Sequence, residues 1–139
     1  MMFTEEDIAR FRQQIADYNL QAPYVLGQLS DFELTKICNG WGPDSWPESI
    51  RKALTALAGE YAVLHVPHDV RYEFRVGTQK SADCEFWTNG KKIWRKRWGW
   101  RGYFYKQAWI ELIALRAAYR ALCAFGSKAW EEVQNDGAS

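Results

Sequence analysis

The sequence predicts a mostly α protein that forms a single domain over residues 1–139. Apolar residues recur at spacings of three and four in several segments, and residues that cap helices precede most of these segments. No segment alternates convincingly between apolar and polar residues, as a half-buried strand would. We expect an N-terminal helix and linker over 1–29, a helical core over 30–130 and a frayed polar tail over 131–139.

The first expected helix begins after Thr4, which forms a capping-box pattern with Asp7. Its single apolar face consists of Ile8, Phe11, Ile15 and Tyr18. One such face favours a helix that docks on the core over one that binds a partner protein. Ser30 and Asp31 can cap a second, short helix that ends at Ile37.

An irregular segment at 38–47 follows, with two glycines, two prolines, Asn and Asp in ten residues. Glycines let carbonyls and amides point at an ion or an oxyanion, which would suit the oxygen ligation of calcium, although most such loops are only turns. A helix is expected next, with its first turn at Pro47 and its end near Ala58.

The apolar segment 60–66 could continue a helix or pass for a short strand, and Pro67 follows it directly. Inside a helix Pro67 would remove the bond to Val63 and cost about 3 kcal/mol. The helix therefore either kinks or a new one starts with Pro67 near its first turn. In the second case Asp69 lies in the first turn, and the helix dipole would lower the pKa of His68 and favour the neutral imidazole.

A set of polar residues that could carry chemistry follows Pro67. His68 and Tyr72 are four residues apart and share a helical face, while Asp69 points about 100° away. A turn at Gly77 would let a second helix bring Asp83 beside His68. The set would then supply a base, a group that orients it and a separate carboxylate for a metal. A solvated helix with one surface histidine is the simpler alternative.

Residues 91–101 contain six basic residues and three tryptophans. Such a segment can bind an anionic lipid surface, or grip nucleic-acid phosphates while its rings stack on bases. It can also be a solvated helix end whose rings pack inward. A phospholipid membrane surface is the expected partner, nucleic acid is disfavoured, and a protein partner stays open. The candidate contact residues are Trp94, Trp98, Trp100, Lys92, Arg95 and Arg97.

The longest apolar-periodic segment predicts a helix from Tyr103 to about Phe125, with Gly126 as its C-terminal stop. The segment 108–126 carries charged residues, and no stretch of about 18 uncharged apolar residues exists. The acidic N-terminus is not a signal peptide. Three cysteines without a CxxC motif indicate reduced thiols, so we expect a cytoplasmic protein.

The ordered set of motifs resembles the phospholipase A2 superfamily, and most closely its small phage- and prophage-encoded members. Residues 39–43 resemble the glycine-rich calcium loop, 68–72 the His-Asp-x-x-Tyr helix, and 82–86 the helix with the second catalytic Asp. Residues 121–126 resemble the Ala-x-x-x-Phe-Gly end of the C-terminal helix. The resemblance covers about 35–130 and implies a phospholipase A2-like fold with two antiparallel core helices.

The resemblance also implies calcium-dependent hydrolysis of a phospholipid ester. His68 would deprotonate the attacking water. Asp83 would hold the His68 ring and stabilise its charge, and Tyr72 would support Asp83.

The calcium ion is a further implication of the resemblance. Its ligands would be the carboxylate of Asp69 and the carbonyls of Gly40, Gly42 and Asp44. The amide of Gly42 would stabilise the oxyanion together with the ion.

Two other interpretations stay open. The chain could be a catalytically inactive phospholipase A2-like phage protein that serves as an interaction or structural module, with segment 94–100 as its contact surface. Trp41 and His65 stand where family members usually carry a bridged cysteine pair, which fits this interpretation. The second is a transition-metal site built from His65, His68, Asp69 and Asp83.

Overall fold

A computed structural model describes residues 3–38, 48, 51–52, 57 and 59–138. Within these ranges the chain is mostly helical and contains no strand, which confirms the mostly α fold class. The α-helices are α1 (Glu5–Asp17), α2 (Asp31–Ile37), α4 (His65–Phe74), α5 (Gln79–Trp98) and α6 (Lys106–Ala138). Short 3-10 helices occur at η1 (Tyr24–Gln28), η2 (Gly59–Leu64) and η3 (Gly99–Phe104).

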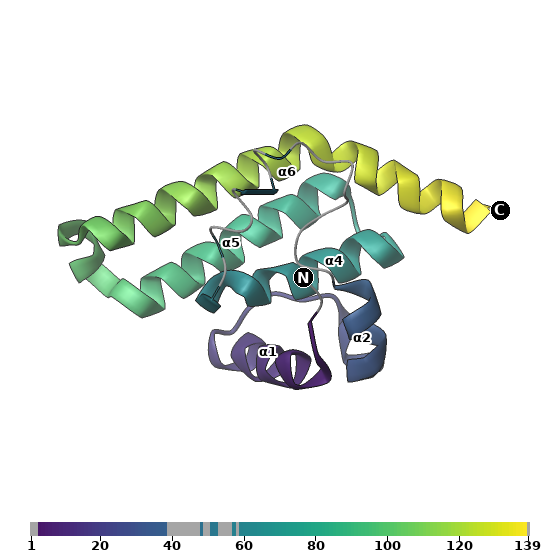
Figure 1. The fold of residues 1–139 in the computed structure, drawn as a ribbon, viewed down its shortest axis with the longest axis horizontal. Helices are drawn as coiled ribbons and strands as arrows, with labels where there is room; N and C mark the ends of the chain where they lie inside the picture. Colours follow the sequence, from purple (N-terminus) through teal and green to yellow (C-terminus); the bar gives the residue numbers. More distant parts are fainter. Residues whose placement is uncertain (1–2, 39–47, 49–50, 53–56, 58, 139) are drawn as a thin grey trace.

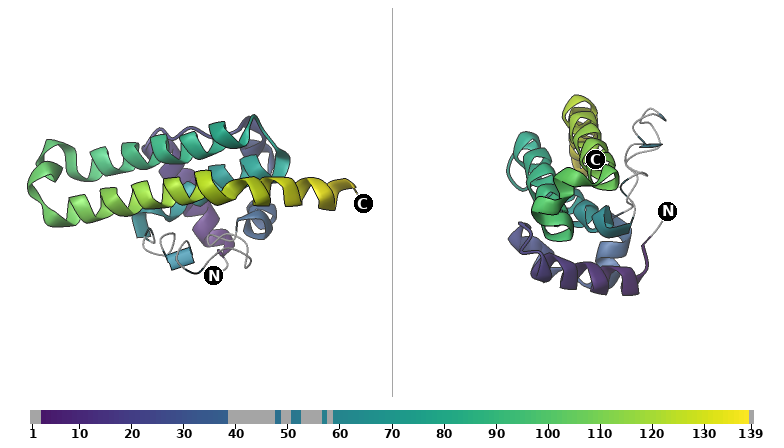
Figure 2. Two further views of the ribbon diagram at one scale, coloured as in Figure 1. Left: turned by 90° about the horizontal axis from the view of Figure 1, so that it is seen from above. Right: turned by 90° about the vertical axis from the view of Figure 1, so that its left-hand side faces the viewer.

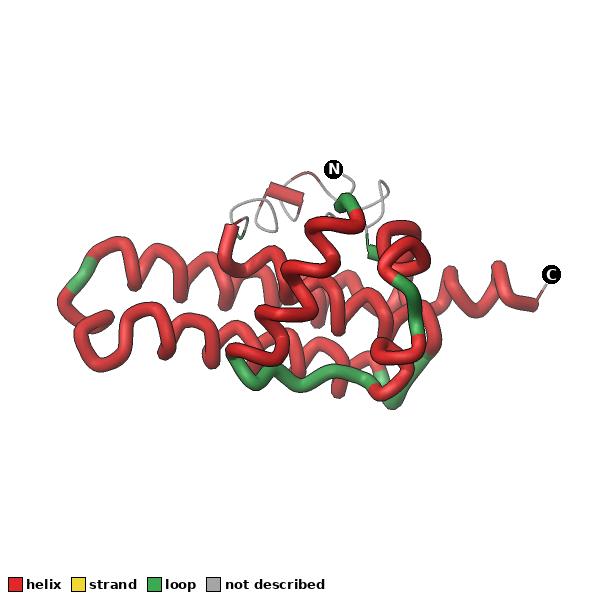
Figure 3. Tube along the Cα trace, turned by 90° about the horizontal axis from the view of Figure 1, so that it is seen from below, coloured by secondary structure: helices red, strands yellow, loops and turns green. Residues whose placement is uncertain are grey.

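The helices form three layers, with α4 in the middle. Helices α1 and α2 lie on one side of α4, and the long α5–α6 hairpin lies on the other (Figures 1 and 2). The connection from α1 to α2 runs along the surface through η1 (Figure 3). Because α4 contacts both outer layers, its buried residues Val66 and Val70 lie at the centre of the hydrophobic core.

The N-terminal helices begin where the capping residues predict. The Thr4 hydroxyl accepts a hydrogen bond from the Asp7 amide, and the Asp7 carboxylate accepts one from the Thr4 amide in return. Ser30 and Glu33 form the same reciprocal pair at the start of α2. Each box satisfies amides that would otherwise lack partners in the first turn.

Pro67 lies in the first turn of α4, so a new helix starts there rather than a kinked one continuing. Residues 59–64 form the 3-10 helix η2, and the alternative of a short strand over 60–66 is wrong. α4 begins at His65, which makes Pro67 its third residue. The missing amide of Pro67 costs little because first-turn amides have no partner inside the helix.

The chain reverses direction between α4 and α5 at residues 75–78. Arg75 ends α4 with a left-handed backbone (φ 52°), and Gly77 follows with φ 81°. A positive φ is easy only for glycine, which explains Gly77 in this turn. Arg71 of α4 links the two helices, because its guanidinium donates to both carboxylate oxygens of Glu85 on α5, at 2.9 and 2.7 Å.

Helices α5 and α6 pack closely along the hairpin. The inner face of α5 is buried, as shown by Ala82, Phe86, Ile93 and Trp94. The indole of Trp94 donates to the Ala108 carbonyl at 2.7 Å. The backbone of Gly90 lies directly against the buried Leu115 side chain, where no Cβ would fit.

The prediction that Gly126 ends the last helix is wrong. α6 continues through Gly126 to Ala138, so residues 131–138 are helical where a frayed tail was expected. Gly126 is buried, and a Cβ there would collide with the Tyr72 hydroxyl. The glycine therefore permits close packing of α6 on α4 rather than a left-handed cap. No helix in the described part of the chain is both long and apolar enough to cross a membrane.

We predict that Gly90→Val lowers the free energy of unfolding by about 1–3 kcal/mol, because the added side chain must displace Leu115 in a packed interface. Urea unfolding followed by circular dichroism would measure the loss. Gly27→Val is the matched control, since nothing lies within 4 Å of a Cβ at that position. An equal loss in the two variants would contradict the proposed close packing of α5 on α6.

Candidate active site

His68 and Asp83 meet between α4 and α5, deep in the protein. The Nε2 atom of His68 lies 2.9 Å from Oδ1 of Asp83. The side chains of His68 and Asp83 are 6% and 1% exposed. The turn at residues 75–78 brings the two helices together, so a pairing across 15 positions of sequence becomes a short hydrogen bond.

Two further side chains bind the Asp83 carboxylate. The Tyr72 hydroxyl donates to Oδ1 at 2.8 Å, and the Gln79 amide donates to Oδ2 at 3.3 Å. The Phe86 and His68 rings meet edge to face, with ring centroids 5.6 Å apart. These contacts fix the orientation of the imidazole and exclude water from its Asp83 side.

Asp69 lies on the opposite edge of the imidazole. Its Oδ1 atom is 3.5 Å from Nδ1 of His68. Its Oδ2 atom is buried and accepts no hydrogen bond from the residues that the structure describes. A buried carboxylate oxygen without a partner is costly in a protein, and it is the kind of ligand that a hard cation takes.

The charge of His68 is set by these two carboxylates. Burial favours the neutral imidazole, but the hydrogen bonds and charges of Asp69 and Asp83 outweigh it and raise the pKa of His68 to about 9. The expectation of a lowered pKa at the helix N-terminus is therefore wrong. The helix dipole is a fraction of a charge, whereas two full negative charges lie against the ring.

His65 has the opposite behaviour, although it lies one turn away on α4. Burial lowers its pKa to about 4, against the opposing influence of Asp69. Its ring packs near Phe86, with centroids 6.0 Å apart. Within the described ranges, no group of three or more His, Cys, Asp and Glu side chains is arranged to hold a metal ion.

Two residues of the site were missed in the sequence. Gln79 precedes Asp83 by four positions on one helix face, a spacing that could have indicated the contact. Gly126 gives Tyr72 its space, but it lies more than 40 positions away and only the packing of α6 reveals it. The proposed calcium ligands Gly40, Gly42 and Asp44 lie outside the described residues.

The Trp-rich segment is only partly available for contact with a partner. Trp94 is 5% exposed. Trp98 is half-buried, and its indole Nε1 donates a hydrogen bond to Oε1 of Glu111 at 3.2 Å. Trp100 is 70% exposed. Of the candidate cations, Lys92 donates to the Asn19 carbonyl, Arg97 pairs with Glu111, and Arg95 is exposed.

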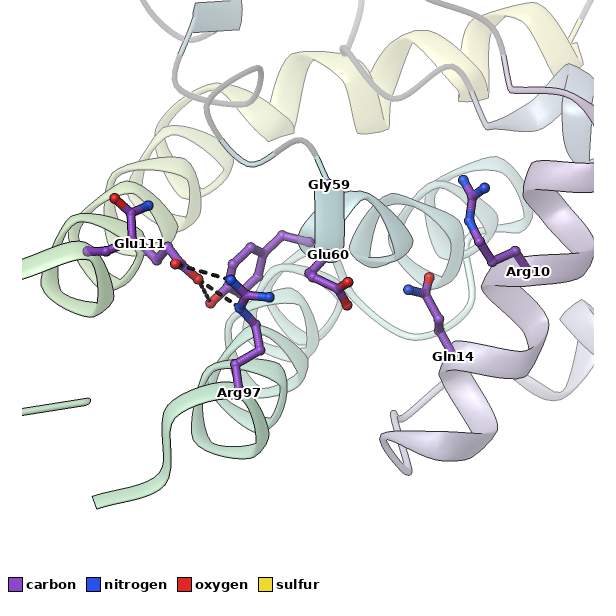
Figure 4. Close-up of a pocket in the computed structure, with 8 residues that line it drawn as sticks. Arg10, Gln14, Gly59, Glu60, Arg97 and Glu111 are labelled. Atoms are coloured by element: carbon purple, nitrogen blue, oxygen red, sulfur yellow. Dashed lines mark hydrogen bonds and ion pairs between the residues drawn. The ribbon is translucent and has the colours of Figure 1, made fainter. Parts of the chain in front are cut away.

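Two adjoining pockets, which share Gln14 and Arg97 in their linings, open on the surface. The larger has a volume of about 510 Å³ and the smaller about 450 Å³. In the larger pocket Arg97 points to Glu111, while Gln14 and Glu60 lie between Arg97 and Arg10 (Figure 4). Neither pocket is lined by His68 or Asp83, so neither describes a substrate site for this pair.

The arrangement can transfer protons. A histidine held by a buried carboxylate on one ring nitrogen can accept a proton from water on the other, and the carboxylate stabilises the imidazolium that forms. In this site Nε2 faces Asp83, and Nδ1 is the nitrogen on the Asp69 side.

Comparisons of the chain with protein-family models, curated proteins and solved structures find no match.

We predict that the two histidines titrate on opposite sides of neutrality. NMR titration of the imidazole resonances should give a pKa near 9 for His68 and near 4 for His65. The chain has two histidines, so His65→Asn assigns both signals. A His68 resonance that titrates below pH 6.5 would contradict the role given to the carboxylates.

The same shifts predict the pH dependence of stability. The pKa of His68 is raised above its ordinary value of 6.5, so its stabilising contribution is complete below pH 6.5 and is lost as pH rises through about 9. The pKa of His65 is depressed, so its contribution is lost as pH falls from about 6.5 to about 4. Unfolding free energies of wild type, His68→Asn and His65→Asn across this range would separate the two effects.

Proposed function

We propose that the protein hydrolyses an ester of a phospholipid in a calcium-dependent reaction, in the manner of the phospholipase A2 superfamily that its motifs resemble. The observation that carries this proposal is the buried hydrogen bond of 2.9 Å between His68 Nε2 and Asp83 Oδ1. Hydrolysis needs an oriented base, and this contact with its Tyr72 support supplies the orientation.

In the proposed reaction, Nδ1 of His68 accepts a proton from the attacking water. The imidazolium that results keeps its Nε2–H bond to Asp83, whose negative charge lies in a buried site and therefore acts strongly. The proton is then returned to the leaving alkoxide. Tyr72 and Gln79 position Asp83 and have no direct contact with the substrate in this scheme.

The residues present are compatible with a calcium site. The Oδ2 atom of Asp69, which is buried and accepts no hydrogen bond from the described residues, is a suitable oxygen ligand beside the base. Asp69 would bind the ion with the carbonyls of Gly40, Gly42 and Asp44, and the Gly42 amide would donate to the oxyanion. When bound, calcium supplies a Lewis acid that polarises the ester carbonyl.

The raised pKa of His68 has a consequence for this chemistry. At neutral pH the imidazole is protonated and cannot act as a base while both carboxylates are free to stabilise its charge. A divalent cation on Asp69 would offset one of these negative charges and favour the neutral ring. The proposed requirement for calcium therefore includes the base as well as the oxyanion.

We predict that His68→Ala lowers calcium-dependent release of fatty acid from phospholipid by about 10²- to 10⁴-fold, because it removes the base. Release would be measured with calcium in excess and again with a chelator. Glu73→Ala is the matched control, since Glu73 is an exposed residue of the same helix. If wild type releases no fatty acid with calcium in excess, the proposal is lost and the inactive interaction module takes its place.

Tyr72→Phe should have a smaller effect of the same kind. It removes one hydrogen bond to the charged Asp83 carboxylate at 2.8 Å, worth about 1.5–3 kcal/mol, so the rate should fall roughly 10- to 150-fold. The pH–rate profile should shift as well, because Asp83 then stabilises the imidazolium differently. A rate equal to that of His68→Ala would mean that Tyr72 does more than position Asp83.

A further inference from the structure

The net charge of +1 conceals a strong separation of charge along the chain. Residues 86–127 contain nine Lys and Arg side chains and one acidic side chain, Glu111. The rest of the chain contains nine basic and sixteen acidic side chains. Since residues 86–127 form most of the α5–α6 hairpin, one end of the molecule is positively charged and the remainder is negatively charged.

The single acid of this region does not weaken its charge at the surface. Oε1 of Glu111 accepts hydrogen bonds from the Tyr61 hydroxyl at 2.8 Å, Arg97 at 3.0 Å and the Trp98 indole at 3.2 Å. Glu111 is thus occupied on the inner side of the hairpin, whereas Arg101, Lys106 and Arg120 are exposed.

Large apolar side chains gather at the same end of the molecule. Trp100, Tyr103, Phe104, Trp109, Ile110 and Ile113 are 42–77% exposed. Trp109, Ile110 and Ile113 share one face of α6 because they are three and four residues apart. We call this set, together with Arg101, Lys106 and Arg120, the aromatic–basic surface.

Contacts within the aromatic–basic surface hold the rings in place. Trp100 meets Phe104 edge to face at 6.1 Å between centroids, and the Arg101 guanidinium lies over the Trp100 ring at 5.8 Å. Tyr103 and Trp109 are 5.9 Å apart, and the Trp109 indole donates to the Tyr103 carbonyl. The rings are therefore exposed without being free to fold back on the core.

We propose that the aromatic–basic surface binds an anionic lipid bilayer. Trp and Tyr prefer the interface of a bilayer, and surrounding cations attract anionic headgroups. A second copy of the chain is a poor occupant, because a symmetric contact buries the same surface of both copies and would gather two sets of Arg101, Lys106 and Arg120 in one interface. Nucleic acid would satisfy the cations but would leave Ile110 and Ile113 in contact with phosphate and water.

The surface lies at the end of α5 opposite to the candidate active site. Asp83 and Trp98 are separated by about 20 Å along the helix, at 1.5 Å per residue. Membrane binding therefore does not rest on the proposed hydrolysis. Only its use in bringing the enzyme to a lipid substrate rests on that proposal.

The test is co-sedimentation of the full chain with vesicles of phosphatidylcholine, with and without phosphatidylglycerol. A chelator is present throughout, so that the lipids stay intact whether or not the proposed calcium-dependent hydrolysis occurs. We expect binding to the anionic vesicles and a loss on the order of tenfold or more for Trp100→Ser with Phe104→Ser. Tyr24→Ser with Phe32→Ser is the matched control, since these rings are 86% and 55% exposed on the other side of the molecule.

Charge reversal gives an independent measurement. Arg101→Glu with Lys106→Glu should weaken binding on the order of 30-fold or more, whereas Lys36→Glu with Lys80→Glu makes the same change in net charge and should have little effect. Equal losses in the two pairs, or no binding to anionic vesicles, would overturn the proposal. Self-association or nucleic-acid binding that depends on Trp100 and Phe104, without vesicle binding, would also overturn it.

The proposed hydrolysis is judged separately with a monomeric short-chain phospholipid in wild type. Failure to cleave this soluble ester, with vesicle binding intact, removes the proposed function and leaves the surface in place. Cleavage of the soluble ester without vesicle binding supports the proposed hydrolysis and overturns the proposed membrane-binding surface.

Discussion

The carboxylate of Asp83 is the point on which the centre of this protein depends. It is 1% exposed, and it is held by His68 at 2.9 Å, Tyr72 at 2.8 Å and Gln79 at 3.3 Å. Removing one partner of a buried ion pair costs about 3–5 kcal/mol, so these contacts, and that of His68 with Asp83 above all, are conditions for folding as much as for chemistry. They fix the distance between α4 and α5, and Gly126 lets α6 close over the same place.

This constraint also explains the charge state of the site. An imidazole between Asp69 and Asp83 is stabilised as a cation, and its pKa rises to about 9 in spite of its burial. One turn earlier, His65 has no such pair of carboxylates and its pKa falls to about 4. Two histidines on one short helix therefore differ in charge at neutral pH, which makes Asp69 the residue through which a cation could change the state of the base.

The two ends of α5 have different characters. Near Gln79 the helix carries the buried polar site, and near Trp98 it carries cations and exposed rings. Glu111 acts at the second end as Asp83 does at the first, since it accepts hydrogen bonds from one donor of η2 and two donors of α5 and so ties η2, α5 and α6 together. The separation would let one long helix support the proposed reactive site and the proposed binding surface without either disturbing the packing of the other.

The sequence by itself determined the features that depend on near neighbours. Capping pairs at Thr4 and Ser30 and the turn at Gly77 follow from spacing over a few residues. For Pro67, and for the pairing of His68 with Asp83, the sequence offered the observed arrangement beside an alternative, and the structure chose between them. Only the tertiary structure decided the role of Gly126, the burial of Trp94 and the pKa of His68, because each depends on atoms brought close from distant positions. Helix propensity could not distinguish a glycine that ends a helix from one that makes room for a tyrosine.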